Sequence, residues 1–507
     1  MNFGILTDYL WGNRAKFGYL FIAALILLFT CLGAREIWTQ EHRWADIVSG
    51  MFYRHDFLHP YLGQNQYYDK PLLSYWAIAF LTQVSGSLTT WTLRLPSALA
   101  GLLAIWSIYR LGISIKNKNL GLLAGWLLLT TYYFLFWART SSADMLNLAG
   151  SLFAVAWYFD KRDRATFLDY TVFFLILAVT SLCKGLGGAV IPIIAVLVDV
   201  WLQKSWKKHL RASVLLTTIP AIIVYLSPFL ASTYFGGEAY GQSGLYLVYR
   251  ENVLRYVHPF DHQGPIYLYV AYLPIYLLPW AFFFIPALIA LKSRWHSLST
   301  EAKWVAWTLL CLFIFFTLSG SRRSYYILPV VPYAILLTAE WILSAAILTK
   351  KQINAAIATV VSFVFLFIAI DMLPAWYYSH YGVNRFAVLL KDEANQIRPW
   401  DQWNIVLLDA ESKVNFYLQL PPNVKDYLSG KMNPNKQITA SLLQTLPILN
   451  QKPDNTIFIS RKRYASLLQP YFVGYHLVEL PPASTHLPFV QNHDMNAPIA
   501  FVPAAIL

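Results

Sequence analysis

The stretch GYLFIAALILLFTCLGA, residues 18–34, indicates the fold class of this chain. It contains no charged residue, and similar apolar blocks recur as far as VVSFVFLFIAIDML at residues 360–373. A helix needs about 20 predominantly apolar residues to cross a bilayer. No small-residue cleavage site follows the first block, so it predicts a retained helix rather than a signal peptide. The pattern predicts a polytopic α-helical membrane protein.

Composition and charge agree with this class. The 507 residues are 57% hydrophobic and only 13% charged, whereas soluble domains carry about 25% charged residues. The net charge of +13 does not indicate nucleic-acid binding, because the excess lies in short loops between apolar blocks, as the positive-inside rule predicts. Residues beyond 375 carry 11 Lys and Arg against 9 Asp and Glu, a balance of +2. The three cysteines fall in apolar blocks and are expected to be small buried hydrophobes.

Apolar periodicity predicts eleven to thirteen spans, because one or two long blocks could each form a pair. Loops rich in Lys and Arg alternate along the chain with loops that are not, which predicts a cytoplasmic N-terminus and an outward-facing C-terminal portion. The spans are expected at 18–35, 95–113, 120–137, 144–159, 167–183, 186–203, 212–232, 264–291, 303–319, 325–347 and 354–374.

Two regions outside the spans have their own expected structure. The outward loop 36–94 contains segments 45–54 and 72–83, which are typical of interfacial helices. The chain is expected to divide into a transmembrane domain, 1–374, and a soluble α/β domain, 375–507. In the latter, short apolar runs predict strands within 403–411, 455–463 and 474–482. Helices are expected at 411–418, 437–447 and 461–468.

Ionisable residues gather on the outward side, where such residues at membrane depth indicate function. Each has an ordinary alternative: Asp144 could cap a helix, His262 could be a loop histidine, and Arg322 with Arg323 could be solvated. As a set they predict an anion site, and phosphate fits Arg and Lys. The chain lacks an Asp-x-Asp sequence and a phosphate-cradling Gly-rich loop, so a sugar donor would be linked to a lipid.

Several motifs carry a resemblance to a known family. The segments DFLHPYLGQNQYYDKPLLSYW, ARTSSADM, CKGLGGAVIP and SRRSYYILPVVPYAILL resemble the bacterial branch of the dolichyl-phosphate-mannose–protein mannosyltransferase superfamily, closest to the lipid A 4-amino-4-deoxy-L-arabinose transferases. The resemblance covers about residues 10–332. It implies an inverting, multi-span GT-C glycosyltransferase of the bacterial inner membrane with a periplasmic C-terminal domain. The implied donor is an undecaprenyl-phosphate sugar, and the implied acceptor is lipid A.

The resemblance also implies roles for individual residues. Asp69 and His262 match metal ligands of the family, and two such ligands suit a divalent ion such as zinc. Asp144 matches a second cavity acid, and Lys70 matches a lysine that contacts the donor phosphate. The other implied donor-phosphate residues are Arg43, Arg322, Arg323 and Tyr326.

One position departs from the family pattern. The family has Asp-Glu-x-Arg where this chain has Gln40, Glu41, His42 and Arg43, and an amide cannot act as a base at neutral pH. Either Glu41 or Asp144 serves as the base, or none is needed. The latter fits a phosphate acceptor, which is already anionic. A slow enzyme or one of altered role is equally permitted.

Three other functions are compatible with the sequence. A protein O-glycosyltransferase of the same superfamily would need a base for Ser or Thr hydroxyls. A transporter of lipid-linked sugars would be expected to place charges near the membrane midplane and to show inverted repeats, and no repeat is visible. A relative that only binds polyprenyl phosphate is the third. The sugar itself is not encoded in a recognisable motif.

Overall fold

The computed structural model describes residues 8–38, 40–63, 65–209, 211–235, 246, 249–258, 262–344, 375–428, 454–480 and 495–504. It divides into two compact units. The first comprises residues 1–32, 57–60 and 67–369, and the second comprises residues 33–56, 61–66 and 370–507. The expected span 354–374 and the expected helix 437–447 lie outside the described residues.

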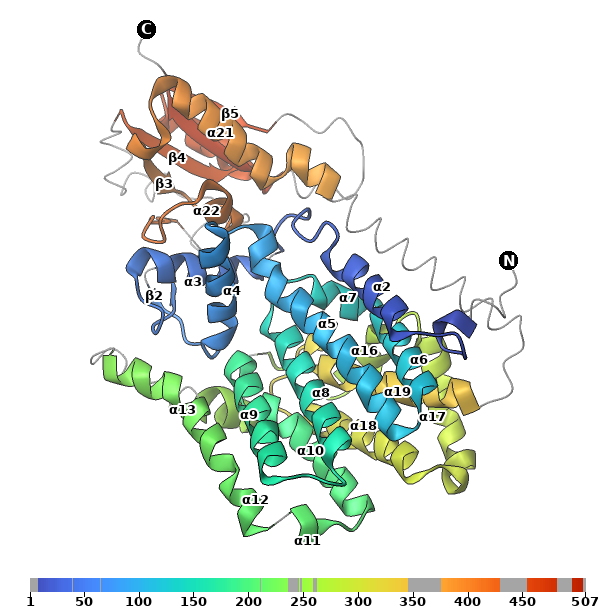
Figure 1. Ribbon diagram of the computed structural model, residues 1–507. Coiled ribbons are helices and arrows are strands. Elements are labelled where there is room, and N and C mark those ends of the chain that lie inside the picture. Colours follow the sequence, from blue (N-terminus) through green and yellow to red (C-terminus); the bar gives the residue numbers. More distant parts are fainter. Residues whose placement is uncertain are drawn as a thin grey trace. The chain divides into compact units, whose positions relative to one another are not determined.

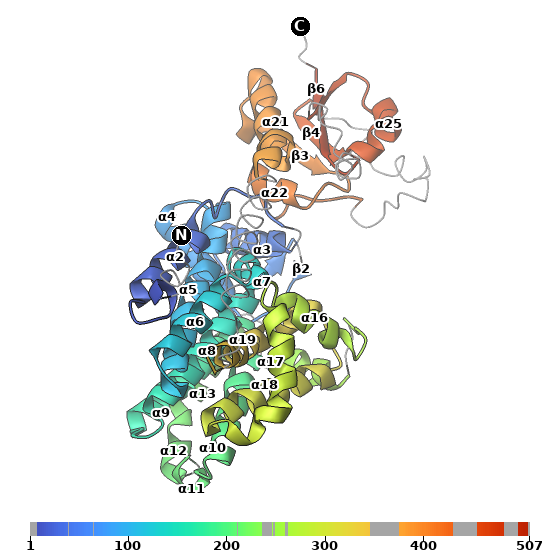
Figure 2. The ribbon, with the colours of Figure 1, turned by 90° about the vertical axis from the view of Figure 1, so that its right-hand side faces the viewer.

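The first unit is a bundle of helices, which Figures 1 and 2 show from two sides. Its helices, in chain order, are α2 (Phe17–Phe29), α4 (Leu73–Ser85), α5 (Thr90–Ile115), α6 (Lys118–Leu129), α7 (Tyr132–Ala138), α8 (Ala143–Lys161), α9 (Phe167–Lys184), α10 (Gly187–Leu202), α11 (Trp206–His209), α12 (Ala212–Leu216), α13 (Thr218–Phe235), η2 (Tyr249–Leu254), α15 (Arg255–Val257), α16 (Leu268–Tyr276), α17 (Ala281–Arg294), η3 (Trp295–Ser297), α18 (Thr300–Leu318), η4 (Ser324–Val330) and α19 (Val331–Ser344).

Most predicted spans correspond to helices, but their lengths vary. Among the described residues, five helical segments are long and apolar enough to cross a membrane: 90–115, 167–184, 212–235, 300–318 and 324–344. The expected span 120–137 is broken, because α6 and α7 meet at an angle of 72°. The expected span 264–291 is also two helices, and a cis Leu278–Pro279 bond lies between α16 and α17.

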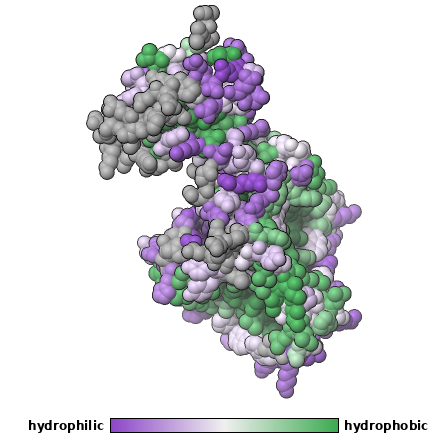
Figure 3. Space-filling view, turned by 90° about the vertical axis from the view of Figure 1, so that its left-hand side faces the viewer, coloured by the Kyte–Doolittle hydropathy of each residue, from purple (hydrophilic) through white to green (hydrophobic). Residues whose placement is uncertain are grey.

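The surface of the first unit suits a hydrocarbon environment. Figure 3 shows a broad hydrophobic area on one face of this unit. Large apolar side chains such as Ile223, Phe282 and Ile289 are 62%, 69% and 72% exposed. An exposed apolar surface of this kind in a bundle of apolar helices is typical of a multi-pass membrane protein.

The second unit contains a four-stranded sheet. Its strands are β3 (Asn404–Leu407), β4 (Thr456–Arg461), β5 (Tyr475–Glu479) and β6 (Pro498–Pro503), in the order β3-β4-β6-β5. β3 and β4 are parallel, and β6 is antiparallel to both of its neighbours. The three predicted strands are confirmed, and β6 was missed. Its two prolines stand at the strand's ends, where a missing backbone donor costs least.

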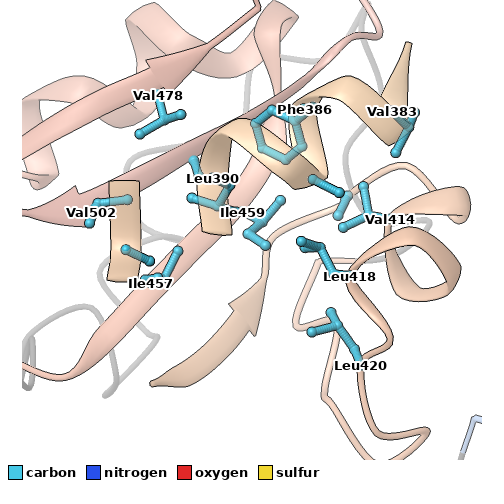
Figure 4. Packing of buried hydrophobic residues seen from close by; sticks show 14 of the residues in the cluster. Val383, Phe386, Leu390, Val414, Leu418, Leu420, Ile457, Ile459, Val478 and Val502 are labelled. Atoms are coloured by element: carbon cyan, nitrogen blue, oxygen red, sulfur yellow. The ribbon is translucent and has the colours of Figure 1, made fainter. Parts of the chain in front are cut away.

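Helices cover both faces of this sheet. Figure 2 shows α21 (Val383–Ile397) and α25 (Ala465–Leu468) on opposite sides. Strand side chains alternate between two cores because successive residues of a strand point to opposite faces. In β4, Ile457 and Ile459 pack under α21 and α22 (Lys413–Leu418), as Figure 4 shows, while Phe458 packs on the other face. The domain is therefore a small α/β layered structure.

Residues 33–56 pack with the α/β domain in the second unit. They include α3 (Glu41–Arg54), and residues 61–66 add a short hairpin of β1 (Tyr61–Leu62) and β2 (Asn65–Gln66). Glu36, which is 7% exposed, accepts hydrogen bonds from Val383 N at 2.7 Å and Lys413 Nζ at 2.8 Å. Ile37 N donates to Tyr417 Oη at 3.0 Å. These bonds tie a segment expected to belong to the transmembrane domain to helices more than 340 residues further along the chain.

Candidate functional site

A cavity of about 160 Å³ in the first unit collects charged and polar side chains from segments far apart in the sequence. Its wall also has an apolar part, which includes Ile191, Phe315 and Phe316. Two of its lining residues, Lys70 and Tyr326, are among the predicted phosphate-binding residues, and Asp69 is a predicted metal ligand. The other polar lining residues are Asn147, Lys184, Glu251, Asn252, Arg255, Tyr256, Ser319 and Ser321.

Two cations and two carboxylates meet at one side of this cavity. Lys70 Nζ lies 3.0 Å from Asp69 Oδ1 and also donates to the Asp69 carbonyl oxygen at 3.0 Å. Arg255 forms an ion pair with Glu251 and lies 3.5 Å from Asp69 Oδ1. Burial raises the pKa of the Glu251 carboxyl, which lies outside the spans. The sequence patterns assigned no individual role to Arg255 or Glu251, because no motif marks them.

The second ion pair joins Asp144 to Lys184. Asp144 lies in the first turn of α8, where Ser142 caps the helix by accepting from Asp144 N at 2.9 Å. The Ser142 hydroxyl in turn donates to Asp144 Oδ2 at 2.7 Å. The alternative that Asp144 caps the helix is therefore wrong: the cap is Ser142, and the Asp144 carboxylate is engaged by Lys184.

Local backbone structure places Lys184 at the cavity. It is the last residue of α9, and Gly185 follows with φ +124°, a conformation that side-chain-bearing residues rarely adopt. Lys184 Nζ lies 5.0 Å from the centre of the Tyr326 ring, which favours a cation. The stretch CKGLGG thus ends one helix, turns the chain and begins α10 at Gly187.

The predicted arginine pair makes other contacts. Arg322 donates to the Gly264 carbonyl at 2.7 Å and the Thr317 carbonyl at 3.1 Å, which braces the backbone. Arg323 donates to Tyr325 Oη at 2.8 Å and to His262 Nδ1 at 3.0 Å. Neither arginine is among the residues that line the cavity. Their assignment to the donor phosphate stays a prediction.

The contacts of Asp69 and His262 do not fit a divalent metal. Both Lys70 and Arg255 lie within 3.5 Å of an Asp69 oxygen, and their charges repel a cation. Arg323 can only donate, so His262 Nδ1 is the acceptor, and a neutral His262 then carries its proton on Nε2. No group of three or more metal-binding side chains occurs among the described residues.

Glu41 and Arg43 belong to the second unit and are described with it. Glu41 is fully buried at the start of α3, and its Oε2 accepts from Trp38 N at 2.7 Å. Arg43 is exposed on the same helix turn. Gln40 immediately precedes α3 and its side chain does not cap the helix. These contacts give Glu41 a local structural part, and its role as a base stays a prediction.

Comparison with known proteins identifies proteins that are similar to this chain. Residues 69–231 match the family described as dolichyl-phosphate-mannose-protein mannosyltransferase. An undecaprenyl phosphate-alpha-4-amino-4-deoxy-L-arabinose arabinosyl transferase of Pectobacterium atrosepticum is 26% identical over 336 residues, which cover 64% of this chain and 58% of that protein. A transferase of the same description from Shewanella sediminis is 27% identical, over 66% of this chain and 60% of its own length.

Solved structures extend the likeness to nearly the whole chain. ArnT from Cupriavidus metallidurans, bound to undecaprenyl phosphate, aligns with a TM-score of 0.67 over 97% of this chain and 99% of its own, at 18% identity. The Archaeoglobus fulgidus oligosaccharyltransferase in complex with zinc and sulfate aligns over 88% of this chain and 68% of its own, with a TM-score of 0.50 and 12% identity. These similarities confirm the predicted resemblance: residues 69–231 are similar to the dolichyl-phosphate-mannose-protein mannosyltransferase family, and the chain has the fold of ArnT.

Proposed function

We propose that this protein is an inverting glycosyltransferase of the bacterial inner membrane, which moves a sugar from an undecaprenyl-phosphate donor to a phosphate of lipid A. The observation that carries the proposal is a set of lysine donors that remain available beside an apolar wall. An ammonium group has three N–H donors. Within the described residues, Lys70 bonds only to two oxygens of Asp69, and Lys184 bonds only to Asp144.

These donors suit the phosphate of a lipid-linked sugar. The raised pKa of Glu251 supports this, because a carboxyl that is more readily protonated repels an anion less. Ile191, Phe315 and Phe316 offer an apolar surface to the first isoprenyl units of the lipid. Similarity to transferases whose names state an undecaprenyl-phosphate sugar, and the fold of an ArnT bound to undecaprenyl phosphate, support the same donor.

The transfer follows from electrostatics at the cavity. The acceptor oxygen attacks the anomeric carbon from the face opposite the lipid phosphate, and the bond between that carbon and the phosphate oxygen breaks. Its electron pair stays on the leaving phosphate, where Lys70, Arg255 and Lys184 stabilise the growing charge. Stabilising only the charge that develops in the transition state accelerates the reaction.

The acceptor is proposed as a phosphate because the candidate bases are already engaged. Asp144 accepts from Ser142 and pairs with Lys184, and Glu41 accepts from Trp38 N. Gln40 provides no base. A phosphate acceptor is anionic at neutral pH and needs no proton removed, whereas a protein hydroxyl does. The Archaeoglobus oligosaccharyltransferase is described in complex with zinc and sulfate. Zinc at Asp69 and His262 of this chain is implied by the family resemblance and stays a prediction outside this mechanism.

The proposal is tested with purified protein, undecaprenyl phosphate-linked aminoarabinose and lipid A in liposomes. Lys70→Ala should lower turnover by at least about a hundredfold, because a preorganised charge at the leaving group is lost. Lys207→Ala, which removes an exposed lysine of α11, is the matched control and should leave turnover unchanged. Retained turnover in Lys70→Ala with intact folding would overturn the role of this lysine.

The acceptor is tested in cells. Mass spectrometry of lipid A from cells with and without this gene should show a mass increment, equal to one sugar residue, that the deletion removes. An unchanged lipid A would overturn lipid A as the acceptor and direct attention to a protein or another envelope glycan.

A further inference from the structure

Two asparagines line the cavity, and their side chains differ in what they contact. Asn252 Oδ1 accepts a hydrogen bond from Leu186 N at 2.6 Å, so this amide holds the turn between α9 and α10. Asn147 is only 3% exposed, and its Oδ1 has no hydrogen-bond partner among the described residues. A buried acceptor of this kind is costly unless a ligand or water supplies a donor.

The position of Asn147 links it to the charged part of the cavity. It follows Asp144 by three residues on α8, so the two side chains share one face of the helix. Asp144 pairs with Lys184, which also lines the cavity. Polar side chains inside an apolar helix of a membrane protein face a cavity or a partner and are functional candidates by default.

The side-chain oxygen of Asn147 accepts hydrogen bonds, so the donor phosphate cannot be its partner. The phosphodiester of a lipid-linked sugar is anionic and has no N–H or O–H to donate, whereas the sugar carries hydroxyl groups or an amine. The lysines supply donors for the phosphate, and the Asn147 oxygen supplies an acceptor for the sugar.

We infer that Asn147 is a specificity-determining residue that accepts a hydrogen bond from a hydroxyl or ammonium group of the donor sugar. This inference rests on the proposed function, because it assigns part of the same cavity. A site built to bond a substrate O–H or N–H discriminates strongly against ligands that lack it, since its buried polar atom is then left unpaired.

The test separates recognition of the sugar from recognition of the lipid phosphate. Turnover is measured with undecaprenyl phosphate-linked aminoarabinose, and undecaprenyl phosphate without a sugar is titrated as a competing ligand. Asn147→Ala should lower kcat/KM by about 10–100-fold, with an inhibition constant for the bare lipid phosphate within about threefold of the parent value. Ser151→Ala is the matched control, because Ser151 is buried one turn further along α8 and does not line the cavity.

Two variants with side chains of similar size distinguish loss of the acceptor oxygen from loss of folding. Asn147→Asp keeps an acceptor oxygen, whereas Asn147→Leu has none, so the first should retain more turnover than the second. The reverse order would overturn the inference, as would an equal loss of affinity for the bare lipid phosphate in Asn147→Ala. An active parent with an unaffected Asn147→Ala variant overturns this inference alone, whereas an inactive parent overturns the proposed function.

Discussion

Helix α8 carries an ion pair at each end, and the two pairs have different surroundings. At its start, Asp144 pairs with Lys184 beside the cavity. Directly after its end, Arg162 Nη1 lies 2.6 Å from Asp199 Oδ1, and Arg162 Nη2 lies 3.4 Å from Glu301 Oε1. Tyr158 Oη donates to the other Asp199 oxygen at 2.8 Å. The second pair thus belongs to a closed network that joins α8, α10 and α18 and consists of Tyr158, Arg162, Asp199 and Glu301.

The two ion pairs differ in whether their charges stabilise the fold or can bind a ligand. Asp199 is satisfied by a tyrosine and an arginine, and the arginine also contacts a second carboxylate and the Phe159 ring. Lys184 has one carboxylate partner among the described residues and two further donors at the cavity. A closed network rigidifies the helix packing, whereas an incompletely used cation next to an open cavity can bind an anion.

The largest expected effect comes from breaking the closed network. Arg162→Ala leaves two carboxylates close together without their cation, so we expect the free energy of unfolding to fall by about 3–5 kcal/mol. Thermal unfolding in detergent measures this loss. A double variant, Arg162→Met with Asp199→Leu, also removes the more buried of the two carboxylates and should recover part of the stability. A melting temperature unchanged in Arg162→Ala would contradict the structural role.

A smaller loss of stability is expected at the other end of α8. Lys184→Ala should lower kcat/KM by about a hundredfold, because one cation at the leaving phosphate is lost. Its melting temperature should fall less than that of Arg162→Ala, since water in the adjoining cavity can solvate Asp144. Turnover and thermal unfolding, measured on the same preparations, check both statements. A larger stability loss in Lys184→Ala would reverse the assignment of the two pairs.

Asp46 in α3 is a third case, a partly buried carboxyl without a partner. Within the described ranges it makes no hydrogen bond or ion pair, and burial raises its pKa to about 7. The folded state holds this proton more tightly than the unfolded chain. The contribution of the protonated carboxyl to the free energy of unfolding is therefore complete below about pH 4 and is lost as the pH rises to about 7. Asp46→Asn should therefore raise the melting temperature at pH 8 by about 2–4 °C.

The control for this prediction is the same variant at pH 4, where parent and Asp46→Asn should melt at similar temperatures. If parent and Asp46→Asn melted at the same temperature at pH 8 as well as at pH 4, the carboxyl would be solvated in the folded protein.

The smallest effect is expected from metal removal. Because Asp69 faces two cations and His262 accepts from Arg323, dialysis against a chelator should change turnover by less than about twofold. A large loss that zinc restores would contradict this expectation and would support the metal ligands that the family resemblance implies.

The sequence alone determined the main elements because their signals are local. Long apolar blocks predicted the helices, and short apolar runs predicted β3, β4 and β5. The sequence also brought attention to Lys70, Asp69 and Tyr326, which the structure places at one cavity. Local patterns did not reveal the break between α6 and α7, helix α21 or strand β6, whose prolines are typical of loops.

Which charged residues meet depends on tertiary packing. Arg255 and Glu251 stood in the sequence without a recognisable motif, and Lys184 stood in one without an assigned role. Their joint position depends on the packing of α8, α9, η2 and α15. The same holds for Glu36, whose partners Val383 and Lys413 lie hundreds of residues away. Side-chain pairing across such separations is set by the packed fold, whereas apolar periodicity is set within a few turns of each segment. Helices and strands could therefore be predicted, but the composition of the cavity could not.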